Sequence, residues 1–234
     1  MALHPTRSVL SLQGITLGDH QFSGSLGKID LELPRRGVSL IQVDDEADAA
    51  TLLDVCLGIS NPRVGRVSFL GVDWMTRTPA ERMHRRRRVG AVVQTGFWPA
   101  HMTILEAVLL PAAYHFDQSR EEVIEHATEL ARLFGLPGLP TTRRETTLKH
   151  VLVRAACVRG FLGSPDLILL HDTALEQVPE LAEPMAQAIS AARDRGAAIL
   201  WITVSLAAQV TRLVEAEQIL RLGEHGLTRA RRGR

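Results

Sequence analysis

The sequence has few of the features that mark several large classes of protein. It contains two cysteines, Cys56 and Cys157, and each lies in an apolar context. We interpret them as small core residues rather than as a disulfide or a pair of metal ligands. No run of about 18 apolar residues is present, and the N-terminal MALHPTRSVL lacks the apolar core of a signal peptide. Both absences predict a cytosolic protein.

The chain also has almost no net charge, +1 at pH 7 over its 234 residues. No overall electric field therefore favours nucleic acid or an anionic membrane. Basic residues do cluster locally, at Arg85–Arg88 and in the tail 229–234. Because no aromatic interleaving and no nucleic-acid motif accompanies the first cluster, we interpret it as a solvated helix face and expect no nucleic-acid partner. The tail is typical of a disordered end, with contact to anionic lipid headgroups as the alternative.

Short apolar segments alternate with helical patterns along most of the chain. Apolar alternation over residues 8–33 predicts two antiparallel strands, and the apolar DLILLHD (166–172) predicts a central parallel strand. Further strands, such as 38–43 and 197–204, alternate with helices, which predicts a mostly parallel sheet covered on both faces. The helical stretch from about 103 to 160 does not fit this alternation. It predicts a helical subdomain inserted in an α/β core.

The stretch QVDDEADAATLL, residues 42–53, follows one predicted strand and opens a helix. It contains no glycine and no lysine, and four carboxylates stand within five positions: Asp44, Asp45, Glu46 and Asp48. Carboxylates at a helix start accept its free N–H groups and suit the positive end of its dipole. A self-capped helix is therefore our main interpretation, and we expect no metal. Binding of a divalent cation by the same carboxylates is the alternative.

The order of these elements and several local strings resemble the ATPase subunit of an ATP-binding cassette (ABC) transporter over roughly residues 8–228. The strings are TLLDVCLGISNPRVGRVSFLGVDWMTRTPAERMHRRRRVGAVVQ, PAHMTILEAVLLP and VRAACVRGFLGSPDLILL. They are similar to the family's segments from its first helix to its Q-loop, after the Q-loop, and from its signature helix to its Walker-B strand. The resemblance implies a single ABC-ATPase-like domain over 1–234. Its P-loop α/β core would cover about 1–100 and 162–234, with N-terminal antiparallel strands, and its helical subdomain about 101–161.

Aligned in this way, the acidic stretch falls on the family's phosphate loop. The degenerate positions are Val43, Asp44, Asp45, Glu46, Asp48, Ala49, Ala50 and Thr51. Ala49 stands at the lysine and Ala50 at the magnesium-binding hydroxyl. Losing the lysine removes charge-assisted hydrogen bonds worth roughly 1.5–3 kcal/mol. Each carboxylate about 4 Å from a phosphate charge costs about 4 kcal/mol at an effective dielectric constant of about 20, before screening by salt. We therefore expect the usual phosphate pose to be lost.

The other catalytic positions of the family depart from its pattern as well. The Asp-Glu pair that ends the Walker-B strand is His171-Asp172 here, and histidine is a poor magnesium ligand. The switch histidine is Val204, and the signature Leu-Ser-Gly-Gly-Gln is Thr147-Leu148-Lys149-His150-Val151. We therefore expect no enzymatic activity and no cofactor. The alternative is a divergent ATPase that keeps ATP and Mg²⁺, with Asp172 as the base.

Gln94 is retained at the Q-loop position. In the family this region lies beside the groove that receives a coupling helix of the membrane subunit. We predict a surface for docking a partner, formed by Gln94, Phe97, Trp98, His101 and Met102. The alternative is that Phe97 and Trp98 cover the helical subdomain.

Together, the resemblance and these departures imply a catalytically degenerate ABC transporter subunit that does not bind ATP in the usual way. It would act as structural or regulatory partner of a membrane permease, of an ATPase paralogue or of both. It would form a homodimer or a heterodimer with that paralogue and lie peripherally on the inner face of the membrane. Lys149 and His150 can then contact a phosphate bound by the partner. The alternatives are a divergent ABC ATPase that hydrolyses ATP to drive transport, and a soluble interaction protein without a permease.

Overall fold

The computed structural model describes most of the chain. The described residues are 8–17, 27–93, 98–115, 119–171, 178–205 and 216–230. Gln94, Phe97 and Asp172 lie outside them. No helix within the described ranges is long and apolar enough to span a membrane.

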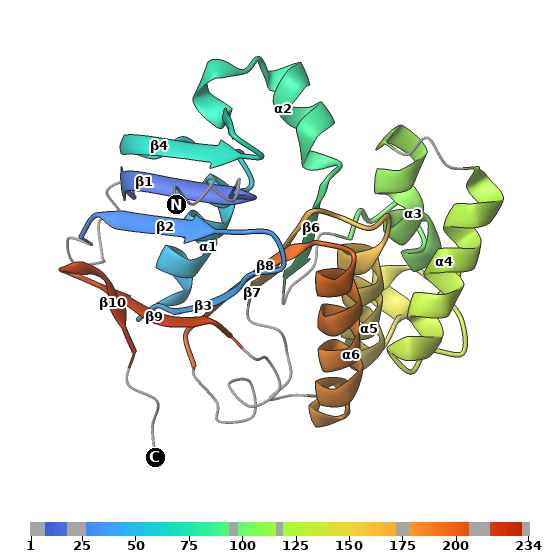
Figure 1. The fold of residues 1–234 in the computed structure, drawn as a ribbon. Coiled ribbons are helices and arrows are strands. Elements are labelled where there is room, and N and C mark those ends of the chain that lie inside the picture. Colours follow the sequence, from blue (N-terminus) through green and yellow to red (C-terminus); the bar gives the residue numbers. More distant parts are fainter. Residues whose placement is uncertain are drawn as a thin grey trace.

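A six-stranded sheet, mostly parallel, forms the centre of the molecule (Figure 1). Its strands, in spatial order, are β10 (Gly226–Arg229), β9 (Gln218–Gly223), β3 (Val38–Gln42), β8 (Ala198–Thr203), β7 (Leu167–His171) and β6 (Val89–Val93). Only β10 runs antiparallel to its neighbour, at the edge of the sheet. Every residue of β7 and β8 is buried, because helices or the second sheet cover both faces. This sheet confirms the predicted α/β class.

A smaller antiparallel sheet lies beside the first, and α1 (Glu46–Cys56) packs between the two. Its strands, in spatial order, are β2 (Ile29–Leu33), β1 (Leu10–Thr16), β4 (Val64–Phe69) and β5 (Val72–Asp73). Pairing of β1 with β2 confirms the antiparallel strands predicted within 8–33. Leu52 and Cys56 of α1 are fully buried in an apolar cluster to which both sheets contribute.

The remaining helices are α2 (Pro79–Arg86), α3 (Ile104–His115), α4 (Arg120–Leu133), α5 (Lys149–Phe161) and α6 (Ala182–Asp194), with short 3₁₀ turns η1 (Trp74–Thr76), η2 (Arg144–Thr146) and η3 (Pro179–Leu181). Helices α3 to α6 gather on the side of the central sheet away from the antiparallel sheet (Figure 1). Successive residues of β7 pack on opposite faces of the sheet. Ile168 packs with these helices, and Leu169 packs with α1. Helices α3 to α5 form the expected helical insertion. Its boundaries, at about 101 and 161, stay a prediction.

Helix α5 crosses β6 at a distance that only glycine permits. A Cβ atom built on Gly90 would lie 1.9 Å from the carbonyl oxygen of Gly160. A Cβ atom built on Gly160 would lie 2.3 Å from Cγ2 of Val92. The helical subdomain therefore rests backbone to backbone on the sheet.

Both cysteines are buried and free, as predicted. Burial raises the pKa of Cys56 and of Cys157 to about 12. Both thiols therefore stay protonated at neutral pH and pack as small apolar groups.

Candidate functional site

The connection from β3 to α1 contains the residues predicted to stand at the family's phosphate loop. It consists of three residues, 43–45, because α1 already begins at Glu46. The backbone N–H of Val43 donates to the carbonyl oxygen of Thr203 at 2.9 Å, which ties the connection to β8. Asp45 has extended φ and ψ angles, and its Oδ1 accepts a hydrogen bond from the backbone N–H of Asp48 at 2.8 Å. Asp45 is therefore the N-cap of α1.

The other carboxylates of this acidic stretch also contact groups of the protein. Asp44 Oδ1 lies 3.0 Å from a guanidinium nitrogen of Arg221 on β9. Glu46 Oε2 lies 3.3 Å from Nε2 of His171, at the end of β7. Asp48 is only 3% exposed. The fold thus brings the acidic stretch into contact with His171, the residue predicted at the Walker-B position. It adds Arg221, which carries no local sign of this role in the sequence.

Replacing Asp45 with alanine is expected to destabilise the protein by about 1 kcal/mol, because the backbone N–H of Asp48 loses its acceptor. The change is measured as a shift in the midpoint of urea unfolding. Asp45→Asn keeps a capping oxygen and serves as the control, so it should lie close to the wild type. Equal stability of the alanine and wild-type proteins would show that the cap contributes nothing.

The residues of this connection do not fit a phosphate group held in the usual way. A connection of three residues offers no wrapped row of free N–H groups, and one N–H at the start of α1 is already bonded to Asp45. No lysine is present, and Ala49, at the lysine position, is fully buried in the core. Within the described part of the chain, no three His, Cys, Asp or Glu side chains converge as metal ligands. The absence of a metal stays a prediction.

Trp98, one of the predicted docking residues, is a packing residue in this structure. Its side chain is 6% exposed, and the guanidinium carbon of Arg159 lies 4.5 Å from the centre of its ring. Burial lowers the pKa of Arg159, and the aromatic face partly compensates for the water that this cation has lost. The alternative interpretation, coverage of the helical subdomain, therefore applies to Trp98. His101 is exposed and Met102 is half-buried, so both remain candidates for docking.

The start of α5 contains the residues predicted to stand at the family's signature sequence. Leu148 is its N-cap and makes no side-chain capping bond. Leu148 is 65% exposed, and Lys149 and His150 beside it are exposed too. The positive end of this helix therefore faces outward together with a cationic side chain.

Comparison with known proteins places these features in context. No family model matches the sequence. Nod factor export ATP-binding protein I of Burkholderia thailandensis is 26% identical over 159 residues, which make up 67% of this chain and 50% of that protein. The chain thus matches about half the length of this relative.

Solved structures match over nearly the whole chain. The dimeric structure of MJ0796, a bacterial ABC transporter cassette, has a TM-score of 0.81 at 20% identity and covers 94% of this chain and 97% of that chain. A post-hydrolysis state of the same cassette, bound to ADP and Pi, also has a TM-score of 0.81, at 18% identity over 94% of this chain and 97% of that chain. CbiO1 from Clostridium perfringens, part of the ABC transporter complex cbiONQ, has a TM-score of 0.70 at 15% identity and covers 95% of this chain and 87% of that chain.

These neighbours correct the expectation that the chain takes no cofactor. That expectation used the negative charge of one loop to conclude that the whole chain binds no nucleotide. A cassette of the same fold is bound to ADP and Pi. The charge of a loop bears only on the phosphates that the loop contacts, and the MJ0796 cassette, which has this fold, is dimeric. The chain has the fold of the ABC ATPases and resembles the ATPase subunits of ABC transporters along nearly its whole length.

Proposed function

We propose that this chain is an ABC ATPase-type subunit of a transporter, and that it acts as structural or regulatory partner of a membrane permease, of an ATPase paralogue or of both. The observation that supports this proposal is the start of α1, where Asp45 Oδ1 accepts a hydrogen bond from the backbone N–H of Asp48, which a phosphate bound there would need. A phosphate brought there would displace this cap and stand beside Asp44, Glu46 and Asp48. Catalysis of phosphoryl transfer rests on positioning and on positive charge around the phosphates, and this connection supplies neither.

In this proposal, the nucleotide is bound by the partner subunit of a heterodimer. The exposed start of α5 offers Lys149, His150 and the positive end of a helix dipole. In a heterodimer with an ATPase paralogue, these groups would meet the phosphates of a nucleotide held by the partner. A homodimer of this chain is the second arrangement. In both, docking of a permease through Gln94, Phe97, His101 and Met102 would hold the subunit at the inner face of the membrane.

The comparisons favour a second candidate function, that of a divergent ABC ATPase. The matched relative is an export ATP-binding protein, and one neighbour of the same fold is in a post-hydrolysis state. In this case nucleotide would bind in a different pose, with Mg²⁺, and Asp172 would act as the base.

Hydrolysis of Mg-ATP by the purified chain separates the two candidates. The partner function predicts no phosphate release above that of a protein-free blank, and no difference between the wild type and Asp172→Ala. Asp194→Ala, which removes an exposed carboxylate at the end of α6, is the matched control. Turnover that Asp172→Ala abolishes and Asp194→Ala retains would establish the divergent ATPase and overturn the partner function.

A further inference from the structure

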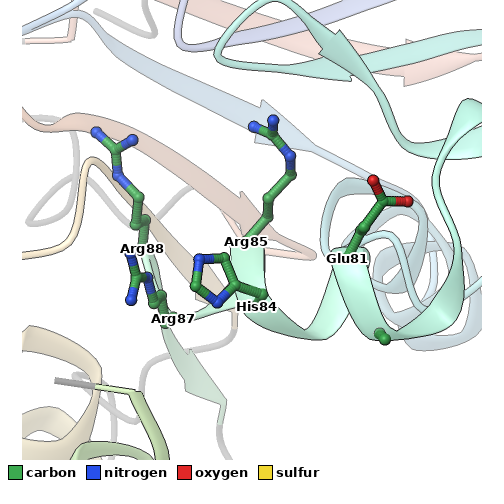
Figure 2. Close-up of a pocket in the computed structure, with 6 residues that line it drawn as sticks. Glu81, His84, Arg85, Arg87 and Arg88 are labelled. Carbon is green, nitrogen blue, oxygen red and sulfur yellow. The ribbon is translucent and has the colours of Figure 1, made fainter.

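A basic hollow of about 500 Å³ lies along α2 and the two residues that follow it (Figure 2). Its lining residues are Ala80, Glu81, His84, Arg85, Arg87 and Arg88. Glu81, His84, Arg85 and Arg88 recur at the spacing of one helix face. Figure 2 shows the side chains of Arg85 and Arg88 extending in the same direction, with His84 between them. The hollow is therefore formed by one continuous face of a single segment.

The opposite face of α2 anchors the helix to the rest of the protein. Arg86 donates from Nη1 to the carbonyl oxygen of Gly58 at 3.1 Å, and Arg82 donates from Nη1 to Oδ1 of Asn61 at 3.1 Å. Thr78 and Glu81 form a capping box at the start of the helix. The run of arginines is thus divided by direction, with Arg82 and Arg86 fixing the helix and the others facing the hollow.

Positive charge exceeds negative charge in the hollow. Its lining holds three guanidinium groups and one carboxylate, that of Glu81, and the carboxylate of Asp166 lies against one of the three, Arg88. Glu81 already accepts hydrogen bonds from the backbone N–H and the hydroxyl of Thr78, at 2.8 and 2.9 Å, and these bonds lower its pKa. The carboxylate is therefore committed to the start of α2 and does not neutralise the far end of the hollow.

Arg85 and Arg88 differ in their partners. Arg88 Nε donates to Oδ2 of Asp166 at 2.6 Å, and Asp166 also accepts from Arg35 at 3.3 Å. Arg85 is half-buried, and over the described ranges its side chain makes no ion pair. Favourable interaction with the helix dipole accounts for basic residues in a last turn. The dipole does not supply the hydrogen bonds to water that a half-buried guanidinium loses. An anion in the hollow would accept hydrogen bonds from the guanidinium and supply them.

The hollow lies at the edge of the central sheet opposite to the degenerate phosphate loop. Arg88 immediately precedes β6, and Asp166 immediately precedes β7, so both stand at the amino ends of their strands. The connection 43–45 follows the carboxyl end of β3. Strand β3 is parallel to β8, and β8 is parallel to β7, so this connection lies at the opposite edge of the sheet from Arg88 and Asp166. The two places are separate, and the hollow goes beyond the proposed function.

We propose that this hollow is a binding site for a phosphate group, with Arg85 as its principal ligand and Arg88, positioned by Asp166, beside it. The planar guanidinium fork matches the oxygens of phosphate and binds them through two parallel hydrogen bonds. A free phosphorylated small molecule and the headgroup of an anionic lipid carry this same group. The site recognises the phosphate, whichever of the two sources presents it.

The test uses the whole chain with two probes. Inorganic phosphate is titrated by calorimetry, and vesicles of phosphatidylcholine, with and without phosphatidic acid, are assayed by co-sedimentation. Arg85→Gln is expected to weaken binding about tenfold or more, as the loss of one charge-assisted pair requires. Arg85→Lys keeps the charge without the fork and should bind with intermediate affinity. Arg132→Gln is the matched control, since Arg132 is an exposed arginine in the last turn of α4.

Each outcome decides the proposal or its source. Phosphate binding that Arg85→Gln loses and Arg132→Gln retains, without vesicle binding, supports the site with a free phosphorylated ligand. Binding to phosphatidic acid vesicles that shows the same dependence on Arg85 supports the site with a lipid headgroup. Absence of binding to both probes overturns the proposal, and so does equal binding by Arg85→Gln and Arg132→Gln. The melting temperature of each variant shows that it is folded.

Discussion

Gly90→Ala should lower the free energy of unfolding by roughly 3 kcal/mol or more, at the upper end of what overpacking costs. The added methyl group would lie 1.9 Å from the carbonyl oxygen of Gly160. A backbone atom cannot rotate away as a side chain can, so β6 and α5 must separate and loosen the apolar contacts on both sides of the crossing. Urea unfolding followed by circular dichroism measures the loss.

Gly138→Ala is the control for this change. No heavy atom lies within 4 Å of a Cβ built at Gly138, and its φ does not lie in the left-handed region. Its stability should remain within about 0.5 kcal/mol of the wild type. If Gly90→Ala were equally harmless, α5 and β6 would not be in backbone contact.

Trp98→Ala is expected to cost about 3–5 kcal/mol of stability, the usual range for a buried large aromatic residue. The change leaves a cavity in the apolar cluster of the helical subdomain and removes the ring beneath Arg159. The cation of Arg159 would then be buried with less compensation, which adds to the loss. Thermal and urea unfolding both report this effect.

His101→Ala separates packing from docking. His101 is exposed and belongs to the same predicted docking set, so its removal should change stability by less than about 0.5 kcal/mol. A Trp98→Ala protein with wild-type stability would contradict the packing role and return Trp98 to the docking surface.

The sequence predicts the fold well because burial leaves a direct pattern in it. The apolar run 167–170 has no polar residue, and a strand of this kind requires cover on both faces. The capping of α1 was also predictable, since carboxylates at a helix start satisfy groups only a few residues away. Helix α2 follows from the same local chemistry, with Thr78, Pro79 and Glu81 marking its first turn.

Features that depend on distant parts of the chain were not predictable. The pair formed by Asp44 and Arg221 joins residues 177 positions apart, and neither residue carries a local sign of the other. The pattern around Trp98 fits an exposed and a buried ring equally, because the residues that cover the ring, such as Arg159, are distant in the sequence. The expectation that no cofactor binds was wrong for a related reason. It considered the contacts of one loop with the nucleotide, whereas several elements of a fold and a second chain can contact a nucleotide.

The glycine crossing also has a mechanical consequence. Packed layers of a protein slide past each other through small rotamer changes in the side chains between them. Gly160 and Gly90 have no side chains that could adjust in this way. Sliding of α5 along β6 is therefore opposed at this crossing, and displacement of this helix would carry β6 with it.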